Sequence, residues 1–361
     1  MIGVAISRGA GPRSNHFKID ESLRSSTMRT YPPAPMNPPS SHKHKQSEHL
    51  IIALGGNAIS PEGEEGNIDQ QFAQTRRSAA HIVDVIESGY VVTLTHGNGP
   101  QIGNIIRRVE LASHDIYRLS LDICVADSQG GMGYMIAQCL GNELQNRGIA
   151  RTFSTVITSV EVDLADPDFS NPTKPIGPIY PSDRAEALQR QAGWDMIEVA
   201  EKGYRRVVPS PVPKKIVEID LIKSLIDRDQ FVIACGGGGI PVARDSAGHL
   251  AGVKAVIDKD RTTALLASHI DVTKLVFVTG VNQVALNYGQ AGEFGLARMS
   301  VAEARAYLAE GQFPAGSMGP KIEAAIDFLE NSRSTDPKVL ICDIERMSQA
   351  LAGQGGTWIE R

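Results

Sequence analysis

From residue 49 onward the chain repeats one pattern, in which a short apolar run leads through glycines into a segment with helical spacing. Examples are "HLIIALGG" before "QQFAQTRRSAAHIVDVIESG" and "YVVTLTHGNGP" before "QIGNIIRRVELA". "GMGYMIAQCLGNELQNRG" is a further helical segment and "ARTFSTVITSVEV" a further strand. Short, continuously apolar runs are typical of parallel strands that are buried on both faces. The pattern predicts an α/β fold with an open, mainly parallel sheet and helices on both faces.

The loops that follow the apolar runs are rich in glycine or charge. They read "GGNA", "HGNGP", "GGGG", "DKD" and "TGV", and the run before "DKD" resembles the end of a strand. Ligands of open parallel sheets bind at the carboxyl ends of the strands, where such loops lie. We therefore expect these loops to meet at one edge of the sheet and to form the functional site.

Two of these loops join glycine to asparagine, and together they favour an anion site. Glycines after a strand let backbone N–H groups approach an anion, with help from the positive end of the next helix. The candidates are Gly55, Gly56 and Asn57 in one loop and Gly97, Asn98 and Gly99 in the other. The alternative is that each glycine only permits a tight turn, but two such loops in one half of the sheet favour ligand binding.

Three lysines stand in unusual settings. Lys174 in "NPTKPIGP" is held between prolines, and Lys259 lies between two aspartates in "VIDKD". Lys321 opens the helical segment "KIEAAIDFLENS", where a cation opposes the helix dipole unless an anion lies nearby. Lys174 and Lys321 could instead be ordinary surface lysines.

The three lysines and the two glycine loops suit phosphoryl transfer, which requires positive groups around the migrating phosphoryl group. Lys259 would neutralise phosphate oxygens, while a neighbouring aspartate would orient it or hold Mg²⁺. Acyl transfer and hydride transfer fit these residues less well. No GxxxxGK[ST] motif and no helix-opening GxGxxG motif is present, which disfavours a P-loop enzyme or a dinucleotide dehydrogenase.

Composition narrows the class of protein. The 361 residues, 42% of them hydrophobic, suffice for one large α/β domain or two lobes. A net charge of −5 and 5% aromatic residues disfavour nucleic acid or an anionic membrane as the main partner. Scattered cysteines without zinc spacing predict buried thiols in a reducing compartment. No apolar stretch approaches the roughly 20 residues of a membrane helix, so we expect a soluble, cytoplasmic protein.

Two segments depart from the repeating pattern. Residues 1–48 are polar and rich in serine and proline, and we predict a disordered extension. A transit peptide, against which Asp20 and Glu21 argue, or a true start at Met28 or Met36 are the alternatives. Residues 163–212 are rich in Pro, Asp and Gly, which predicts rigid irregular loops or a small protruding lobe.

Extended motifs from about residue 50 to the end resemble the carbamate kinases of the amino acid kinase superfamily. They are "ALGGNAI", "THGNGPQIGN", "NPTKPIGP", "VVPSPVPK", "CGGGGIPV", "GVKAVIDKD", "VTGVNQVALNYG" and "PAGSMGPKIEAAI". The resemblance implies an αβα sandwich on an eight-stranded, mainly parallel sheet with a small protruding subdomain. It also implies that residues of about 49–230 bind carbamate or carbamoyl phosphate and those of about 231–361 bind the nucleotide.

The resemblance further implies a homodimer that uses ATP or ADP with Mg²⁺ and catalyses ATP + carbamate ⇌ ADP + carbamoyl phosphate, toward ATP in arginine breakdown. The implied catalytic residues are Lys174, Lys259, Asp260 and Lys321, with Asp260 organising the lysines. The two Gly-Asn loops would face carbamoyl phosphate. The implied nucleotide-binding residues are Gly236, Gly237, Asp258, Thr279, Gly280, Gly316, Ser317 and Met318. No residue is assigned to the metal.

Departures from the family pattern are modest and leave every implied catalytic position intact. Asn282 replaces a common aspartate near the nucleotide, and "GYRR" stands where "GWRR" is usual. A sister kinase acting on another carboxylate or phosphate acceptor, such as glutamate or UMP, is one alternative. A non-catalytic metabolite-binding regulator is another. "NPTKPIGP" favours carbamate kinase over the first, and the retained lysines argue against the second.

Overall fold

The computed structural model describes residues 48–60, 65–199, 202–314 and 316–361, without the Asn57 side chain. Except for Glu48, the predicted N-terminal extension lies outside the described residues. Among the helices of these ranges, none combines the length and apolar character that crossing a bilayer requires. All four cysteines are buried and free, as predicted.

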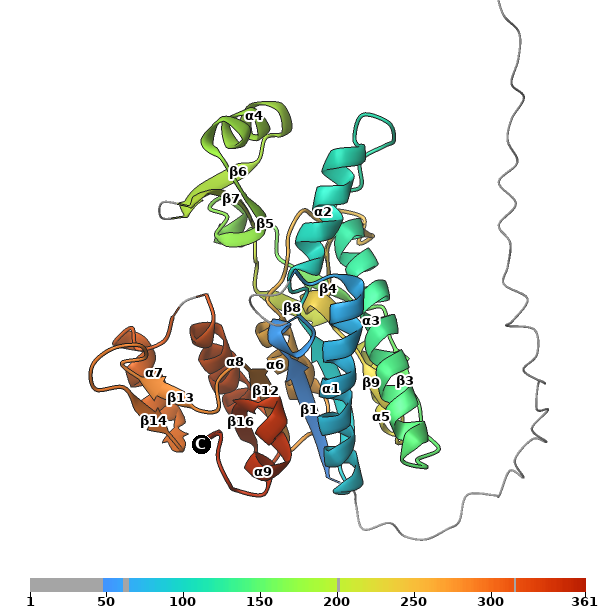
Figure 1. The fold of residues 1–361 in the computed structure, drawn as a ribbon, viewed down its shortest axis with the longest axis vertical. Coiled ribbons are helices and arrows are strands. Elements are labelled where there is room, and N and C mark those ends of the chain that lie inside the picture. Colours follow the sequence, from blue (N-terminus) through green and yellow to red (C-terminus); the bar gives the residue numbers. More distant parts are fainter. Residues whose placement is uncertain (1–47, 61–64, 200–201, 315) are drawn as a thin grey trace, which may run out of the picture. The chain divides into compact units, whose positions relative to one another are not determined.

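A sheet of eight strands forms the centre of the domain, in the order β15-β17-β16-β12-β1-β2-β9-β3 (Figure 1). Its strands are β1 His49–Leu54, β2 Val91–His96, β3 Phe153–Thr155, β9 Phe231–Ile233, β12 Lys274–Thr279, β15 Arg298–Ser300, β16 Lys338–Asp343 and β17 Thr357–Glu360. Only β16 and β17 pair antiparallel within it. The predicted mainly parallel sheet is confirmed.

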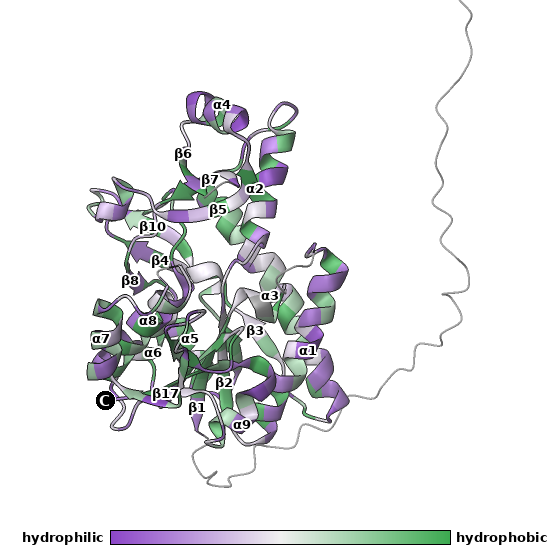
Figure 2. Ribbon diagram, turned by 60° about the vertical axis from the view of Figure 1, so that its left-hand side comes forward, coloured by the Kyte–Doolittle hydropathy of each residue, from purple (hydrophilic) through white to green (hydrophobic). Residues whose placement is uncertain are grey.

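Alternating side chains of β1 enter two separate cores, which explains why this strand is apolar throughout. Leu50, Ile52 and Leu54 pack with one set of helices, α1 (Ile68–Glu87), α3 (Leu121–Asn146) and α9 (Met347–Leu351). Ile51 and Ala53 pack with α5 (Ile219–Ile226), α6 (Lys259–His269) and α8 (Met318–Asn331) on the other face. Figure 2 shows the hydrophobic strands between helices whose outer sides are hydrophilic. The predicted three-layer αβα arrangement is confirmed.

Helix α1 begins at a local capping signal, whereas α2 and α3 begin without a side-chain cap. Asn67 begins α1 with a capping box, in which its side chain accepts from the Gln70 N–H and the Gln70 side chain accepts from the Asn67 N–H. Helix α2 (Gln101–Ala112) covers the predicted "QIGNIIRRVELA". Helix α3 begins at Leu121, well before the predicted "GMGYM" segment.

The segment "ARTFSTVITSVEV" forms two strands in different sheets, so the prediction of one strand is wrong. β3 belongs to the central sheet, and β4 (Ser159–Val162) belongs to a smaller sheet ordered β11-β10-β4-β8. The Gln129 side chain on α3 accepts from the Thr158 N–H and donates to the Thr158 carbonyl, both at 2.9 Å. The Thr158 carbonyl also accepts from the Ile240 N–H of β10 at 2.9 Å, so Gln129 and β10 together hold the chain where it passes from one sheet to the other. The other strands of this sheet are β8 Pro213–Ile216, β10 Ile240–Arg244 and β11 Leu250–Gly252.

A small lobe projects from the predicted 163–212 region (Figure 1). It contains an antiparallel sheet ordered β5-β7-β6 and helix α4 (Ser182–Ala192). Its strands are β5 Lys174–Tyr180, β6 Asp195–Val199 and β7 Gly203–Val208. A helix, α7 (Val301–Ala309), and a hairpin, β13 (Val284–Leu286) with β14 (Phe294–Leu296), complete the C-terminal part.

The "VIDKD" segment does not follow a strand, so that prediction is wrong. Strand β11 ends at Gly252, and the buried Ala255–Ile257 stretch is irregular. A backbone hydrogen bond holds this stretch in place: the Val256 N–H donates to the Pro209 carbonyl at 2.9 Å. The charged residues of the segment therefore lie at the start of α6.

Glu48 belongs to the folded domain by its contacts. Its carboxylate accepts from the Thr273 hydroxyl at 2.6 Å and from the Lys274 ammonium, and its carbonyl accepts from the Val91 N–H at 3.0 Å. We therefore place the useful truncation point after residue 47.

Deleting residues 1–47 is expected to leave activity and melting temperature nearly unchanged, since a polar, proline-rich segment at a terminus is expected to add little to the core. Deleting Glu48 as well should lower the free energy of unfolding by about 1 kcal/mol, because a partly exposed ion pair and two hydrogen bonds are lost. Thermal and urea unfolding of both truncations, beside the full chain, measures this. A large loss on removing residues 1–47 alone would contradict the boundary.

Candidate active site

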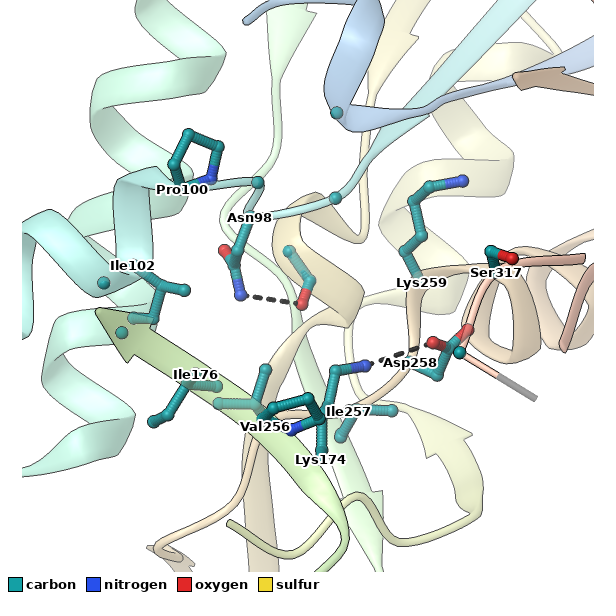
Figure 3. Close-up of a pocket in the computed structure, with 18 of the residues that line it drawn as sticks. Asn98, Pro100, Ile102, Lys174, Ile176, Val256, Ile257, Asp258, Lys259 and Ser317 are labelled. Carbon is teal, nitrogen blue, oxygen red and sulfur yellow. Dashed lines mark hydrogen bonds and ion pairs between the residues drawn. The ribbon is translucent and has the colours of Figure 1, made fainter. Parts of the chain in front are cut away.

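A cavity of about 480 Å³ opens beside the carboxyl ends of β1, β2 and β9 (Figure 3). Its walls come from the loop after β2, the first half of α2, strand β5 of the lobe, the residues that begin α6 and those that begin α8. Segments far apart in the sequence therefore meet at one place, where open α/β sheets bind their ligands.

The Asp260 carboxylate bridges two lysines at the floor of this cavity. One oxygen accepts from the Lys259 ammonium and the other from the Lys321 Nζ at 3.2 Å. The three side chains are only 5%, 10% and 12% exposed, respectively. Burial lowers the pKa of Lys259, Asp260 opposes that shift, and the Lys321 charge adds to it. The two ammonium groups are thus held close together by one carboxylate.

Asp258 has two structural tasks, which explain the charge sequence of "DKD". Its Oδ1 caps α6 by accepting from the Asp260 N–H at 2.8 Å, and its Oδ2 accepts from the Lys174 Nζ at 3.1 Å. Burial acts to raise the pKa of Asp258, but the charges of Lys174 and Lys259 outweigh it and hold that pKa well below its ordinary range. Each charge in the segment therefore has a partner.

The cavity is positive overall. Three lysines face two aspartates, and Arg107 and Arg205 also line it. Arg107 is balanced by Glu110 at 3.0 Å, whereas Arg205 donates to the Gly177 carbonyl at 2.9 Å. An excess of cations in a partly buried site favours a polyanionic ligand such as a phosphate ester.

The glycine loops allow the walls to approach closely. A Cβ on Gly97 would lie 3.1 Å from the Lys259 Cδ, and one on Gly237, whose φ is +66°, would lie 2.1 Å from the Asn98 Oδ1. Asn98 donates to the Gly237 carbonyl at 3.2 Å (Figure 3). It also accepts from the Ser128 hydroxyl at 2.6 Å. Asn98 thus joins the loops after β2 and β9 to α3, which is a structural task in addition to lining the cavity.

Most of the predicted site residues meet in this cavity. Those that line it are Gly56, Gly97, Asn98, Gly99, Lys174, Gly237, Asp258, Lys259, Asp260, Gly316, Ser317 and Lys321. A second cavity of about 250 Å³ is lined by Thr279, Gly280, Ser317 and Met318 among others, and it shares Ser317 with the first. The Asn57 side chain lies outside what the structure describes.

Gly55 and Gly236 are not among the residues that line these two cavities. A Cβ on Gly55 would lie 2.7 Å from the Val278 carbonyl oxygen, and one on Gly236 would lie 2.5 Å from the His96 Nε2. Both glycines therefore permit close packing beside the site. Their position supports the shape of the loops rather than direct contact with a ligand.

Sequence reasoning missed the residues of α2 and the lobe that complete the cavity. Arg107 and Arg205 line it, and so do Gly103 and Gly177. A Cβ on Gly103 would lie 2.9 Å from the Gly177 Cα, so the backbones of α2 and β5 touch at this point. Gly103 interrupts a helical pattern, which was a signal of close approach available in the sequence.

The family model, the related sequences and the solved structures that match this chain agree on one family. A model of the amino acid kinase family matches residues 48–343. The chain is 44% identical over 314 residues to the carbamate kinase of Pyrococcus horikoshii, which covers 86% of this chain and 99% of that protein. It is 42% identical over 314 residues to carbamate kinase 2 of Enterococcus faecalis, with coverage of 86% and 98%. The structure of carbamate kinase from Giardia lamblia bound to AMP-PNP is similar with a TM-score of 0.81 at 38% identity, over 87% of this chain and 99% of that one.

Replacing Asp260 by Asn is expected to lower the free energy of unfolding by about 3 kcal/mol, because it leaves two buried ammonium groups without their counter-charge. The loss should shrink as the pH rises above neutrality, since deprotonation of one lysine removes the repulsion.

The matched control is Glu323→Gln on α8. The Glu323 carboxylate pairs with Arg261 at the surface, so its loss should lower the free energy of unfolding by less than ~0.5 kcal/mol. Urea unfolding of both variants at neutral and alkaline pH measures the difference. Equal, small effects in the two variants would show that the bridge at Asp260 contributes no special stability.

Proposed function

This chain belongs to the amino acid kinase family and is a carbamate kinase, and from that premise we propose that Lys174, Lys259, Asp260 and Lys321 carry phosphoryl transfer between ATP and carbamate. The observation that carries the proposal is the Asp260 carboxylate bonded to two ammonium groups in a positive cavity. Such a pair offers fixed positive charge at one point, which phosphoryl transfer requires.

The reaction moves one phosphoryl group. In the direction of ATP formation, a β-phosphate oxygen of ADP attacks the phosphorus of carbamoyl phosphate. The bond from phosphorus to the carbamate oxygen breaks, and its electron pair leaves with carbamate. Total charge is the same on both sides, so no proton transfer is needed. The charge that spreads over the phosphoryl oxygens is met by Lys259 and Lys321, which Asp260 holds in place before the reaction begins.

We assign carbamoyl phosphate to the side of the cavity formed by the Gly97–Gly99 loop and the lobe. Backbone N–H groups of that loop precede α2, whose positive end favours an anion. Lys174 reaches the same space from the first residue of β5, with Asp258 as its partner. Lys174 would therefore bind the substrate phosphate from the lobe side.

We assign the nucleotide to the side formed by the start of α8 and the second cavity. That cavity also has Tyr288, Phe313 and Pro314 in its walls, which provide an apolar surface for a base. Ser317 belongs to both cavities, so the phosphates would pass it toward Lys321. The AMP-PNP complex of the similar Giardia lamblia enzyme supports a nucleotide as the ligand.

Magnesium is expected to arrive with the nucleotide. Among the described residues, no group of three His, Cys, Asp or Glu side chains could hold a metal, and Asp258 and Asp260 are already bonded to lysines. Mg²⁺ typically binds substrate phosphates and keeps several waters. Bound in that way, it would neutralise phosphate charge. A role of this protein in arginine catabolism and its location in the cytoplasm remain predictions.

The outer face of α3 supports the predicted homodimer. Ile123 and Tyr134 are 44% and 62% exposed there, and Gly130 and Gly131 lie between them with open space at their Cβ positions. Glycine in a helix costs about 1 kcal/mol relative to alanine. An exposed face that combines apolar side chains with glycine suits the close approach of a second copy of this helix.

The activity is tested by supplying ADP, Mg²⁺ and carbamoyl phosphate and measuring ATP. We expect ATP formation from the wild type. Lys259→Ala should lose roughly 10²-fold or more in kcat with a smaller change in nucleotide affinity, because its charge matters most in the transition state.

Two outcomes would contradict these assignments. Turnover of glutamate or UMP without ATP formation would favour a sister kinase, and no turnover of any acceptor would favour a regulator. Wild-type kcat in Lys259→Ala would remove Lys259 from the mechanism while leaving the activity itself established.

Replacing Tyr134 by Glu is expected to shift the protein from dimer to monomer, because a charge would be buried in the interface. Sedimentation velocity measures the state. The control is Leu221→Glu on α5, which is 53% exposed and lies on the opposite face of the sheet from α3, and it should leave the dimer intact. Dimers in both variants would place the interface elsewhere.

A further inference from the structure

A third cavity, of about 310 Å³, lies between the lobe and the region that joins α2 to α3. We call it the lobe cavity. Residues that line it include Val109, Arg118, Leu188, Trp194, Arg206 and Lys254. Helix α4 and the outer part of α2 are joined here, because Arg184 of α4 donates to Glu110 of α2. It is distinct from the site assigned above to the kinase reaction.

The lobe cavity has more cations than its protein partners can balance. Among the described residues that line it, Glu110 carries the only carboxylate, and other protein groups already donate to that carboxylate. Glu110 accepts from Arg184, from Arg107 at 3.0 Å and from the Tyr180 hydroxyl at 3.1 Å. Arg118, Arg206 and Lys254 make no ion pair with any carboxylate in the described part of the chain. The remaining charge favours an anion from outside.

Arg206 is the most informative of these groups. Its guanidinium lies 4.3 Å from the centre of the Trp194 ring, and it makes no hydrogen bond to another described residue. Burial lowers the pKa of Arg206, although its side chain stays a cation. A partly buried guanidinium has five N–H donors in a planar arrangement that matches phosphate and carboxylate oxygens. These donors face the lobe cavity, where an oxyanion could accept from several of them at once.

We propose that the lobe cavity is a binding site for a small organic oxyanion, a phosphate or carboxylate on a planar or apolar body. Arg206 and Lys254 would bind the oxygens, and Trp194 with Leu188 and Val109 would pack against the body. The size of the cavity fits a metabolite rather than a macromolecule.

The position of this site connects it to the lobe that carries Lys174. Arg206 lies opposite Ile176 in the β5–β7 pairing, and Lys174 begins β5. Helix α2 lines both cavities, through Ile102 in the first and Val109 in the lobe cavity. An anion bound here would therefore fasten the lobe against α2 and restrict the movement of Lys174.

The chain has only two tryptophans, Trp194 and Trp358, and this makes the proposal testable by fluorescence. In a Trp358→Phe background, Trp194 is the only indole. We expect phenyl phosphate to change its emission with a saturable curve and inorganic phosphate to compete more weakly. Arg206→Met should weaken the binding of phenyl phosphate at least tenfold, and Lys254→Met, a substitution at an exposed position, should weaken it several-fold.

Lys321→Met in the same background is the control for phosphate binding in the first cavity, and it should change the Trp194 titration less than twofold. A response that does not saturate would overturn the proposal. A response unchanged in both Arg206→Met and Lys254→Met, or abolished in Lys321→Met, would also overturn it. Thermal unfolding verifies that the variants are folded, and Lys254→Met decides the matter if Arg206→Met is not.

Discussion

The carboxylate of Asp260, bonded to two lysines, is the contact on which the rest of the site depends. It requires the first turn of α6 and the first turn of α8 to lie side by side, because Lys321 comes from the second of these helices. The two helices pack through small buried side chains, including Ala264, Ala267 and Ala324. Small residues let helix axes approach closely, and this approach brings the charged ends together. The core and the site are thus consequences of one packing arrangement.

The Asp260 contact also balances the charges of Lys259 and Lys321. Two nearly buried ammonium groups repel each other, and this repulsion must be balanced when no anionic ligand is bound. Asp260 supplies a counter-charge that keeps the pair in position without a ligand, and Asp258 does the same for Lys174. The site therefore keeps an excess of positive charge without leaving any of its lysines unpaired. Positive groups that are already in place need no rearrangement when charge develops on a phosphoryl group.

Sequence reasoning reached the site because local signals marked its loops, and it failed where distant residues decide the structure. Apolar runs ending in glycine identified the strand ends, and the charges of "DKD" indicated Lys259 as a central group. The interpretation of "VIDKD" as a strand end overlooked that Asp258 is a typical N-cap residue. The break between β3 and β4 depends on Gln129 from a distant helix, and no local signal at Thr158 reveals it. The lobe cavity depends on how α4 and β7 lie against α2, which a single sequence does not encode locally.

Lys174 on the lobe is less buried than the two lysines on the core helices, and this difference separates it from them. Lys259 and Lys321 stand on helices that form the buried core, and their side chains are hardly exposed. Lys174 is 26% exposed and stands on a lobe that meets α2 where the backbones of Gly103 and Gly177 touch. An ion pair that is partly open to water is weaker than a buried one. Under the proposed assignment of the site, Lys174 is therefore the lysine that would move with the lobe, while Lys259 and Lys321 would stay fixed around the transferred group.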